Sequence, residues 1–346
     1  MKALVKFKKG VGFVELRELP RPSVAQDEVL IRVRAAGICG TDVHIYHDEY
    51  PYYPPVTLGH EFSGEIVEVG EEVHSWKLGD RVVAEPHTRA CGVCYYCRTG
   101  NPQICPHKRS IGWGIDGAFA EYLAMPVWLL HRMPDNVSFQ EAALTEPTAV
   151  ATSAVNIATG VEVGDTVVVF GPGPIGLLAA QVAKASGASW VMVIGTPSDS
   201  EIRLPVAEEL GADCVLNVAE ADPVQKVMAM TGGRGADLVV DASGAQVAIN
   251  QAVAMIRPLG RICAIGLTGK EEIAFTWDKA VFKSCRIQFS LSSSYLGWEQ
   301  ALSLIASGEV KVDRLITHRV SLEDWSSSFE AAASGKAIKV LLMPMP

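Results

Sequence analysis

Four of the cysteines in this chain lie within fifteen residues and follow a spacing typical of metal binding. Cys91, Cys94, Cys97 and Cys105 form the pattern C-x2-C-x2-C-x7-C. Short x2 spacings let a tight loop wrap thiolates around a tetrahedral zinc ion. Iron–sulfur clusters also use four cysteines, but ferredoxin-type spacings differ from this one. Disulfides are the third alternative, and they are rare in chains without an export signal. We predict a structural zinc site, because four sulfur ligands leave no position open for a substrate.

A second set of residues has the composition of an open metal site. Cys39 lies in `GICGTDVHIYH`, and His60 and Glu61 lie in `GHEFSGEIVEVG`, while Glu146 follows in `LTEPTAV`. A catalytic zinc keeps three protein ligands and leaves its remaining position for water or a substrate oxygen. Cys39, His60 and one of the two carboxylates would supply that set. Asp42 is placed to accept the second N–H of His60, which would fix the imidazole tautomer.

These motifs resemble those of one enzyme family, the medium-chain zinc-dependent alcohol dehydrogenases. The family's zinc signature is matched by Gly59-His60-Glu61-x2-Gly64-x5-Gly70-x2-Val73, and its lobe zinc by the four-cysteine cluster. The chain is most similar to the polyol (sorbitol-like) and threonine dehydrogenases, because Glu146-Pro147 stands where classical alcohol dehydrogenases carry a further cysteine ligand. The order of the motifs, down to the closing `GKAIKVLL`, agrees with this resemblance.

The resemblance implies roles for individual residues. Cys39 and His60 would bind the catalytic zinc, and Glu61 and Glu146 would each bind it directly or stand behind it. Thr41 and His44 would relay the alcohol proton through the cofactor ribose to solvent, which suits a histidine at neutral pH. Tyr46, Trp113 and Glu146 are expected to line the substrate pocket.

From residue 161 onwards the chain alternates strand-like and helix-like segments. `DTVVVFGPGPIGLLAAQVAKASGA` reads as an apolar strand, the glycine pattern G-x-G-x-x-G, and a helix, which is the context that a dinucleotide fingerprint requires. Further strand-like runs bring the total to six, and we predict a doubly wound parallel sheet. The expected cofactor-binding residues are Gly171, Gly173, Pro174, Ile175, Gly176, Gly195, Thr196, Arg203, Gly266 and Leu267.

The end of the second strand departs from the NAD-binding pattern. An acidic residue about 20 positions after the fingerprint ordinarily binds the ribose 2′-OH of NAD. Gly195 occupies that place, and the next basic residue is Arg203, with Asp199 between them. The choice between NAD and NADP therefore stays open.

These observations predict an α/β chain in which a Rossmann sheet is inserted into a mostly-β, GroES-like catalytic domain. The expected boundaries are 1–150 for the first part of the catalytic domain, 151–289 for the dinucleotide-binding domain, and 290–346 for the returning part.

Composition restricts the partners. The net charge is −9 and no block of basic residues occurs, which argues against a nucleic-acid backbone as ligand. The most apolar stretch, from Thr166 to Ile194, contains several glycines, two prolines and Lys184, so it does not read as a membrane span. The first twenty residues lack an export signal pattern, and we expect a cytoplasmic protein. The resemblance adds a homo-oligomer, a tetramer or a dimer.

The sequence predicts a zinc-dependent oxidoreductase that carries two zinc ions and uses NAD or NADP. Its expected reaction is the reversible oxidation of a secondary hydroxyl of a polyol, sugar alcohol or diol to the ketone. The alternatives are an L-threonine 3-dehydrogenase-type activity, a reductase of the same architecture without catalytic zinc, and a non-enzymatic, zinc-stapled dinucleotide-binding protein.

Overall fold

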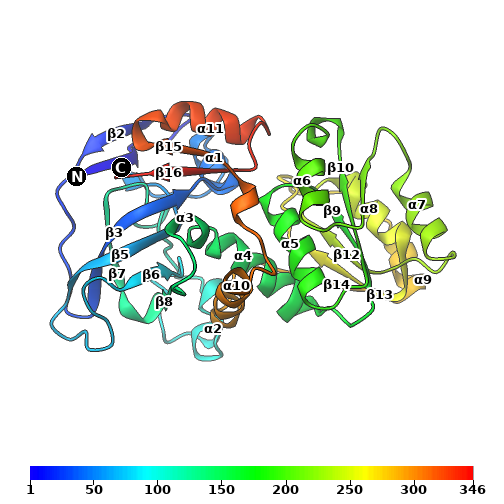
Figure 1. The fold of residues 1–346 in the computed structure, drawn as a ribbon, viewed down its shortest axis with the longest axis horizontal. Helices are drawn as coiled ribbons and strands as arrows, with labels where there is room; N and C mark the ends of the chain where they lie inside the picture. Colours follow the sequence, from blue (N-terminus) through cyan, green and yellow to red (C-terminus); the bar gives the residue numbers. More distant parts are fainter. Residues whose placement is uncertain (346) are drawn as a thin grey trace. The chain divides into compact units, whose positions relative to one another are not determined.

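The structure is a computed structural model that describes residues 1–345, and the chain divides into two compact units. Unit 1 comprises Met1–Glu146 together with the segment from Ile316 to the end of the described chain. Unit 2 comprises Pro147–Leu315. Each unit has its own sheets and its own buried core, and Figure 1 labels their helices and strands.

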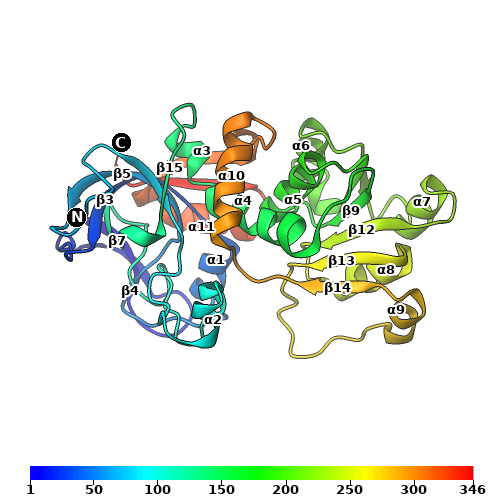
Figure 2. The same cartoon turned by 90° about the horizontal axis from the view of Figure 1, so that it is seen from below.

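Unit 2 is built on a six-stranded parallel sheet with the order β11-β10-β9-β12-β13-β14. The six strands are those expected from the sequence, and their bounds are β9 (Thr166–Phe170), β10 (Trp190–Gly195), β11 (Cys214–Asn217), β12 (Ala236–Asp241), β13 (Ile256–Ala264) and β14 (Arg286–Phe289). Because the order reverses between β9 and β12, the carboxyl ends of these two strands form the switch point at which doubly wound sheets bind ligands. Strand β14 lies at the edge of the sheet (Figure 2).

Helices connect the parallel strands of unit 2, as parallel pairing requires. Helix α5 packs on β9 and β10, and α6 packs on β10 and β11, whereas α7 and α9 contact α8, which lies on β12 and β13. The bounds are α5 (Pro174–Ala185), α6 (Arg203–Glu209), α7 (Pro223–Met230), α8 (Gln246–Met255), α9 (Trp277–Lys283) and α10 (Tyr295–Ser307), with the π-helix η3 (Thr152–Thr159) and the 3-10 helices η4 (Pro197–Asp199) and η5 (Asp313–Leu315).

The contact-based units differ from the expected boundaries at the return of the chain. Residues 290–315 pack within unit 2, and the chain rejoins unit 1 at Ile316 rather than at 290. The cause is helix α10, which packs on η3: the Thr152 hydroxyl donates to the Gly297 carbonyl at 2.8 Å. A side chain at Gly297 would place its Cβ 2.0 Å from the Ser153 hydroxyl, so this close packing requires glycine.

Unit 1 contains a three-stranded and a seven-stranded sheet. The first has the order β2-β1-β4, and the second has the order β15-β16-β3-β5-β6-β8, with β7 paired to β3. Their bounds are β1 (Lys2–Lys6), β2 (Val14–Glu18), β3 (Glu28–Gly37), β4 (Val56–Thr57), β5 (Glu61–Val69), β6 (Arg81–Ala84), β7 (Tyr122–Pro126), β8 (Leu130–Arg132), β15 (Ile316–Ser321) and β16 (Lys339–Met343). Strand β16 pairs with β3 across some 300 residues of sequence, and this pairing returns the end of the chain to unit 1.

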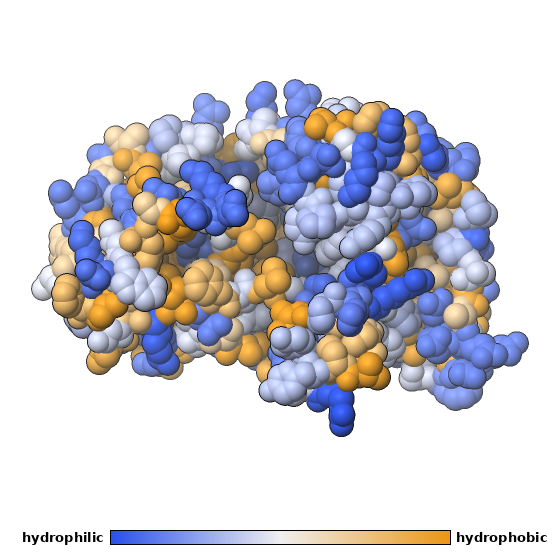
Figure 3. Space-filling view, turned by 180° about the vertical axis from the view of Figure 1, so that it is seen from behind, coloured by the Kyte–Doolittle hydropathy of each residue, from blue (hydrophilic) through white to orange (hydrophobic). Residues whose placement is uncertain are grey.

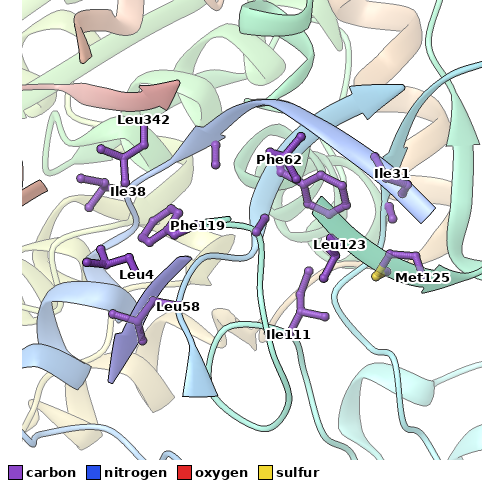
Figure 4. Packing of buried hydrophobic residues seen from close by; sticks show 14 of the residues in the cluster. Leu4, Ile31, Ile38, Leu58, Phe62, Ile111, Phe119, Leu123, Met125 and Leu342 are labelled. Carbon is purple, nitrogen blue, oxygen red and sulfur yellow. The ribbon is translucent and has the colours of Figure 1, made fainter. Parts of the chain in front are cut away.

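The helices of unit 1 are short. They are α1 (Gly40–Tyr46), α2 (Tyr95–Arg98), α3 (Phe139–Ala142), α4 (Thr145–Ala151, which continues into unit 2) and α11 (Trp325–Ala333), with the 3-10 helices η1 (Pro102–Ile104), η2 (Val127–Leu129) and η6 (Leu322–Asp324). The hydrophobic core of unit 1 is formed mainly by side chains of its strands. In Figure 4, the Phe119 ring lies near Leu4, Leu58 and Ile38, while the Phe62 ring lies near Leu123.

Hydrophilic and hydrophobic residues intermix over the face shown in Figure 3. Within residues 1–345, no helix is both long enough and apolar enough to span a membrane.

Candidate zinc and cofactor sites

Two neighbouring strands bring the first candidate site together. Strands β3 and β5 run antiparallel, and Gly37 at the end of β3 pairs with Glu61 at the start of β5. Cys39 follows β3 by two residues and His60 directly precedes β5, so the register places both at one end of the strand pair. Cys39 is also the N-cap of α1, where its backbone N–H donates to Asp42 Oδ2 at 2.9 Å.

The side chains of Cys39, His60 and Glu61 converge. Their ligand atoms all lie within 4.8 Å of one another, and His60 and Glu61 are buried. His60 Nδ1 and Asp42 Oδ1 are buried atoms that form no hydrogen bond, and they lie 3.8 Å apart. A metal-binding histidine ordinarily presents its second nitrogen to a carboxylate in this way. The donor set and the orphaned polar atoms fit a bound zinc ion.

Acidic groups surround the histidine. Burial lowers the pKa of His60, but Asp42 and Cys39 raise it by more, to about 10. Burial raises the pKa of Glu146 to about 7, and the Glu146 carboxyl adds to the negative field at His60. Glu146 thus lies within electrostatic range of His60, although its carboxylate is not one of the three groups whose ligand atoms lie within 4.8 Å of one another. The cluster favours a cation, as expected of a metal site.

Lys339 belongs to this cluster, although sequence reasoning did not single it out. Its buried ammonium donates to both carboxylate oxygens of Glu61, at 2.7 and 2.9 Å, and to the Ile38 carbonyl at 3.0 Å. Burial lowers the pKa of Lys339, but Glu61, Cys39 and Glu146 together raise it by more, so the pKa lies above its ordinary value. A Cβ at Gly37 would lie 2.2 Å from Glu61 Oε2, so only glycine leaves room for the pair.

The expected relay residues lie on α1. The Thr41 hydroxyl is 3.8 Å from Cys39 Sγ. His44 is exposed, and its Nδ1 lies 2.9 Å from Glu49 Oε2.

Two aromatic rings adjoin the cluster. The Trp113 ring packs edge-on against His60, with 5.0 Å between centroids. Tyr46, in contrast, packs against Trp325 and Phe329 of α11. The tyrosine next to Trp113 is Tyr50, which the sequence analysis did not mention.

The four cysteines of the second cluster also converge. The Sγ separations are 3.5 Å for Cys94–Cys97, 3.8 Å for Cys94–Cys105 and 3.7 Å for Cys91–Cys105. A tetrahedron with bonds of about 2.3 Å has edges of about 3.8 Å. The backbone N–H groups of Cys94 and Cys97 point at Sγ atoms, which stabilises thiolates. The cluster therefore fits a tetrahedral zinc ion with no open position.

The fingerprint in unit 2 has the expected form. Gly171 begins the turn after β9 with a φ of +90°, a conformation that favours glycine. A Cβ at Gly176 would lie 1.9 Å from the Gly171 carbonyl oxygen, whereas one at Gly173 would meet nothing within 4 Å. Gly176 thus allows the helix to pack closely, and Gly173 leaves open space beside the turn. Pro174 and Ile175 begin α5, with Gly173 as its N-cap.

A cavity of about 170 Å³ lies beside the fingerprint within unit 2, and Gly171, Gly195 and Thr196 are among the residues that line it. Arg203 does not line this cavity. Its guanidinium donates to Asp199 Oδ1 at 3.2 Å. Gly266 packs on Gly244, and Leu267 is exposed nearby. The turn fits a dinucleotide, since it combines a tight glycine corner with open space at a helix N-terminus.

Comparisons with known proteins agree with this geometry. The alcohol dehydrogenase GroES-like domain model matches residues 25–135, and the zinc-binding dehydrogenase model matches residues 174–307. The chain is 42% identical to a sorbitol dehydrogenase of Halalkalibacterium halodurans over 345 residues, which is 100% of both chains. It is 40% identical to an L-threonine 3-dehydrogenase of Bacillus licheniformis, with 99% of each covered. A zinc-binding dehydrogenase of Sinorhizobium meliloti, solved with NADP, superposes with a TM-score of 0.91, 31% identity and 99% of each chain covered.

The chain therefore belongs to the zinc-dependent medium-chain alcohol dehydrogenase family, and it is an oxidoreductase of that family. The expected family, the α/β fold with its Rossmann sheet and GroES-like domain, and the enzyme class are confirmed.

Proposed function

We propose that this enzyme catalyses the reversible NAD(P)-linked oxidation of a secondary hydroxyl on a small, polyhydroxylated alcohol. The observation that carries this proposal is Glu146, a buried carboxyl within electrostatic range of His60, at the position where a second thiolate would serve a simple-alcohol enzyme. A carboxylate donates less electron density to zinc than a thiolate and offers hydroxyl-rich substrates a hydrogen-bond acceptor. The similarity to a sorbitol dehydrogenase supports the same substrate class.

Glu61 and Glu146 differ in their hydrogen-bond partners, and we assign them different roles. Lys339 engages both oxygens of Glu61, whereas Glu146 forms no hydrogen bond with a described residue. Cys39 and His60 would hold zinc with Glu146, directly or through water, and Glu61 would stand behind them. Zinc, when bound, supplies Lewis acidity toward the alcohol oxygen, and the nicotinamide accepts the hydride.

The chain's own residues move the proton. Thr41 would relay the alcohol proton, taking it up as its own hydroxyl proton leaves toward His44, since the Thr41 hydroxyl lies beside Cys39. His44 would then pass a proton to solvent, to which its side chain is exposed. Asp42 would keep the His60 ring oriented, because its unpaired oxygen faces His60 Nδ1.

A substrate panel tests this proposal. Zinc-replete enzyme is assayed with sorbitol, xylitol, inositols, 2,3-butanediol, L-threonine and simple primary and secondary alcohols, by following reduced nicotinamide absorbance. Polyols or diols should give the highest kcat/KM. L-Threonine is the main competitor, because the chain is 40% identical to a threonine dehydrogenase and a carboxylate-rich cluster also suits an ammonium group. Activity restricted to ethanol-like alcohols would exclude the polyol assignment, and inactivity across the panel would exclude the reaction.

For the cofactor, we infer measurable activity with both NAD and NADP. The Asp199 carboxylate accepts hydrogen bonds from the Thr196 amide and hydroxyl, at 2.9 and 2.8 Å, so it faces its own turn. Arg203 is paired with the same carboxylate. Asp199 therefore does not offer its carboxylate to the ribose 2′-OH of NAD. Arg203 does not offer an unpaired guanidinium to the 2′-phosphate of NADP. The measurement is kcat/KM for each cofactor, and a preference above about a thousandfold, roughly 4 kcal/mol, would contradict this inference.

We also propose a homo-oligomer, a tetramer or a dimer, that uses the edge of the parallel sheet. Within residues 1–345, β14 pairs with β13 alone, so its other side presents unpaired backbone groups. Phe289 and Leu291 at its end are exposed by 77% and 63%. Light scattering should give a mass of two or four chains, and a monomer across micromolar concentrations would contradict the proposal.

A further inference from the structure

Tyr50 is a half-buried tyrosine beside the Cys39–His60 site. Its ring packs edge-on against Trp113, with 5.8 Å between centroids, and Trp113 packs edge-on against His60 at 5.0 Å. Tyr50 is thus one aromatic ring away from a candidate zinc ligand. Burial and then Cys39 raise the pKa of the Tyr50 hydroxyl, which places this hydroxyl within electrostatic range of the Cys39 sulfur.

The Tyr50 hydroxyl forms no hydrogen bond with a described residue, and it is not fully enclosed, so water or a ligand can reach it. The other two tyrosines of the same loop differ. The Tyr52 hydroxyl donates to Asp48 at 2.5 Å and accepts from the Gly10 amide at 3.0 Å. Tyr53 is 52% exposed and its ring lies under the Arg109 guanidinium. Of the three, only Tyr50 combines partial burial near the metal cluster with a hydroxyl that no described residue engages.

The loop that carries Tyr50 is held on both sides. The fully buried Lys6 donates to the carbonyls of Gly10 and Gly12, each at 2.5 Å, and approaches the Tyr46 carbonyl at 3.4 Å. Beyond Tyr50, Lys9 donates to the Tyr52 carbonyl at 2.5 Å. A hydroxyl on a loop fixed in this way is preorganised, so binding a ligand costs little additional ordering.

We propose that the Tyr50 hydroxyl binds a second hydroxyl of the substrate, adjacent to the one that is oxidised, and so selects diols and polyols over simple alcohols. This inference rests on the proposed oxidation at the Cys39–His60 site. A diol gives Tyr50 a hydrogen-bond partner in the substrate, whereas a monoalcohol leaves this half-buried hydroxyl with water alone. Sites built to pair with a substrate hydroxyl discriminate against analogues that lack it.

The test compares Tyr50→Phe with the matched control Tyr53→Phe, which removes a hydroxyl from the same loop. The substrates are 2,3-butanediol and 2-butanol, which differ by one neighbouring hydroxyl. In Tyr50→Phe, kcat/KM should fall roughly three- to tenfold for the diol, chiefly through KM, the size expected for one neutral hydrogen bond. It should stay within about twofold for 2-butanol. Tyr53→Phe should change neither.

A binding measurement gives a second readout without turnover. Calorimetric titration of xylitol into zinc-loaded protein should give a dissociation constant that rises by a similar factor in Tyr50→Phe alone. An unchanged diol-to-monoalcohol ratio, or equal losses for both substrates, would overturn the assignment, since a structural role would weaken both equally. Wild-type protein that is inactive across the whole substrate panel would overturn the proposed function itself, which is a distinguishable result.

Discussion

Replacing Lys339 by methionine should lower the stability of the protein, because the buried Glu61 carboxylate loses its counter-charge. Lys339 and Glu61 are 3% and 1% exposed as side chains, and three hydrogen bonds hold the ammonium in place. Methionine has a similar length and no charge. The variant Lys339→Met therefore leaves the Glu61 carboxylate buried without a counter-charge while disturbing the packing little.

The expected loss of stability is about 3–5 kcal/mol, the usual cost of removing one partner of a buried ion pair. For a unit of this size, each kcal/mol lowers the unfolding temperature by roughly 2–4 °C, so the midpoint should fall by about 6–20 °C. Lys6→Met is the control, because Lys6 is equally buried but donates only to carbonyls. It should cost less, since its loss leaves neutral acceptors unpaired.

The dependence on pH has a defined sign. The folded-state pKa of Lys339 lies above the ordinary value of 10.5, so the pair contributes its full stability below about pH 10.5 and loses it as the pH rises through the folded-state pKa. Urea unfolding of zinc-replete wild type and variant at pH 7 and 9 should show the same difference. Adding Glu61→Gln to Lys339→Met should recover most of the stability, because no buried charge remains. A loss below about 1 kcal/mol in the single variant would refute this reasoning, since Glu61 would then have another counter-charge, such as a metal bound directly.

The remaining predictions concern metal content and the cofactor unit. Cys39→Ser should abolish turnover with the fold intact, whereas Cys94→Ser should lower stability or solubility; metal analysis should find about one zinc per chain in each and about two in wild type. Near-normal activity of Cys39→Ser with verified metal content would contradict the open-site assignment. In unit 2, burial raises the pKa of Asp237, but the Thr166 amide and Arg257 hold it below the ordinary value of 3.8. Asp237→Asn should therefore cost about 2 kcal/mol at pH 7, a difference that shrinks as the pH falls from about 4 through the folded-state pKa, and an unchanged difference at pH 3 would count against it.

Local spacing was enough to predict the parts of the site that are close in sequence. Cys91, Cys94 and Cys97 are brought together by one loop, and the glycine fingerprint by one turn, so their patterns carry their geometry. Cys39 and His60 are separated by twenty residues, and the β3–β5 register brings them together. They could be predicted as neighbours only because they resemble the motifs of a known family.

The parts that sequence reasoning missed depend on long-range packing or on side-chain direction. Lys339 meets Glu61 across 278 residues, and it does so only because β16 pairs with β3. The length of the Tyr50 loop does not indicate which of its tyrosines faces Trp113. The inward turn of Asp199 is likewise a capping interaction, which its spacing from Gly195 did not distinguish from a ribose contact.

The charges of the buried cluster explain why Lys339 and a divalent cation suit the same site. Cys39 as thiolate, Glu61 and Glu146 together carry about three negative charges when ionised, which exceeds what one zinc ion neutralises. Lys339 cancels the charge of Glu61, and a divalent cation then balances the other two. Asp42 is separate, because its unpaired oxygen faces the second nitrogen of His60. The one charge left over is that of the Asp42 carboxylate, which faces His60, so the site accepts an uncharged hydroxyl compound without adding a further unpaired charge to the protein interior.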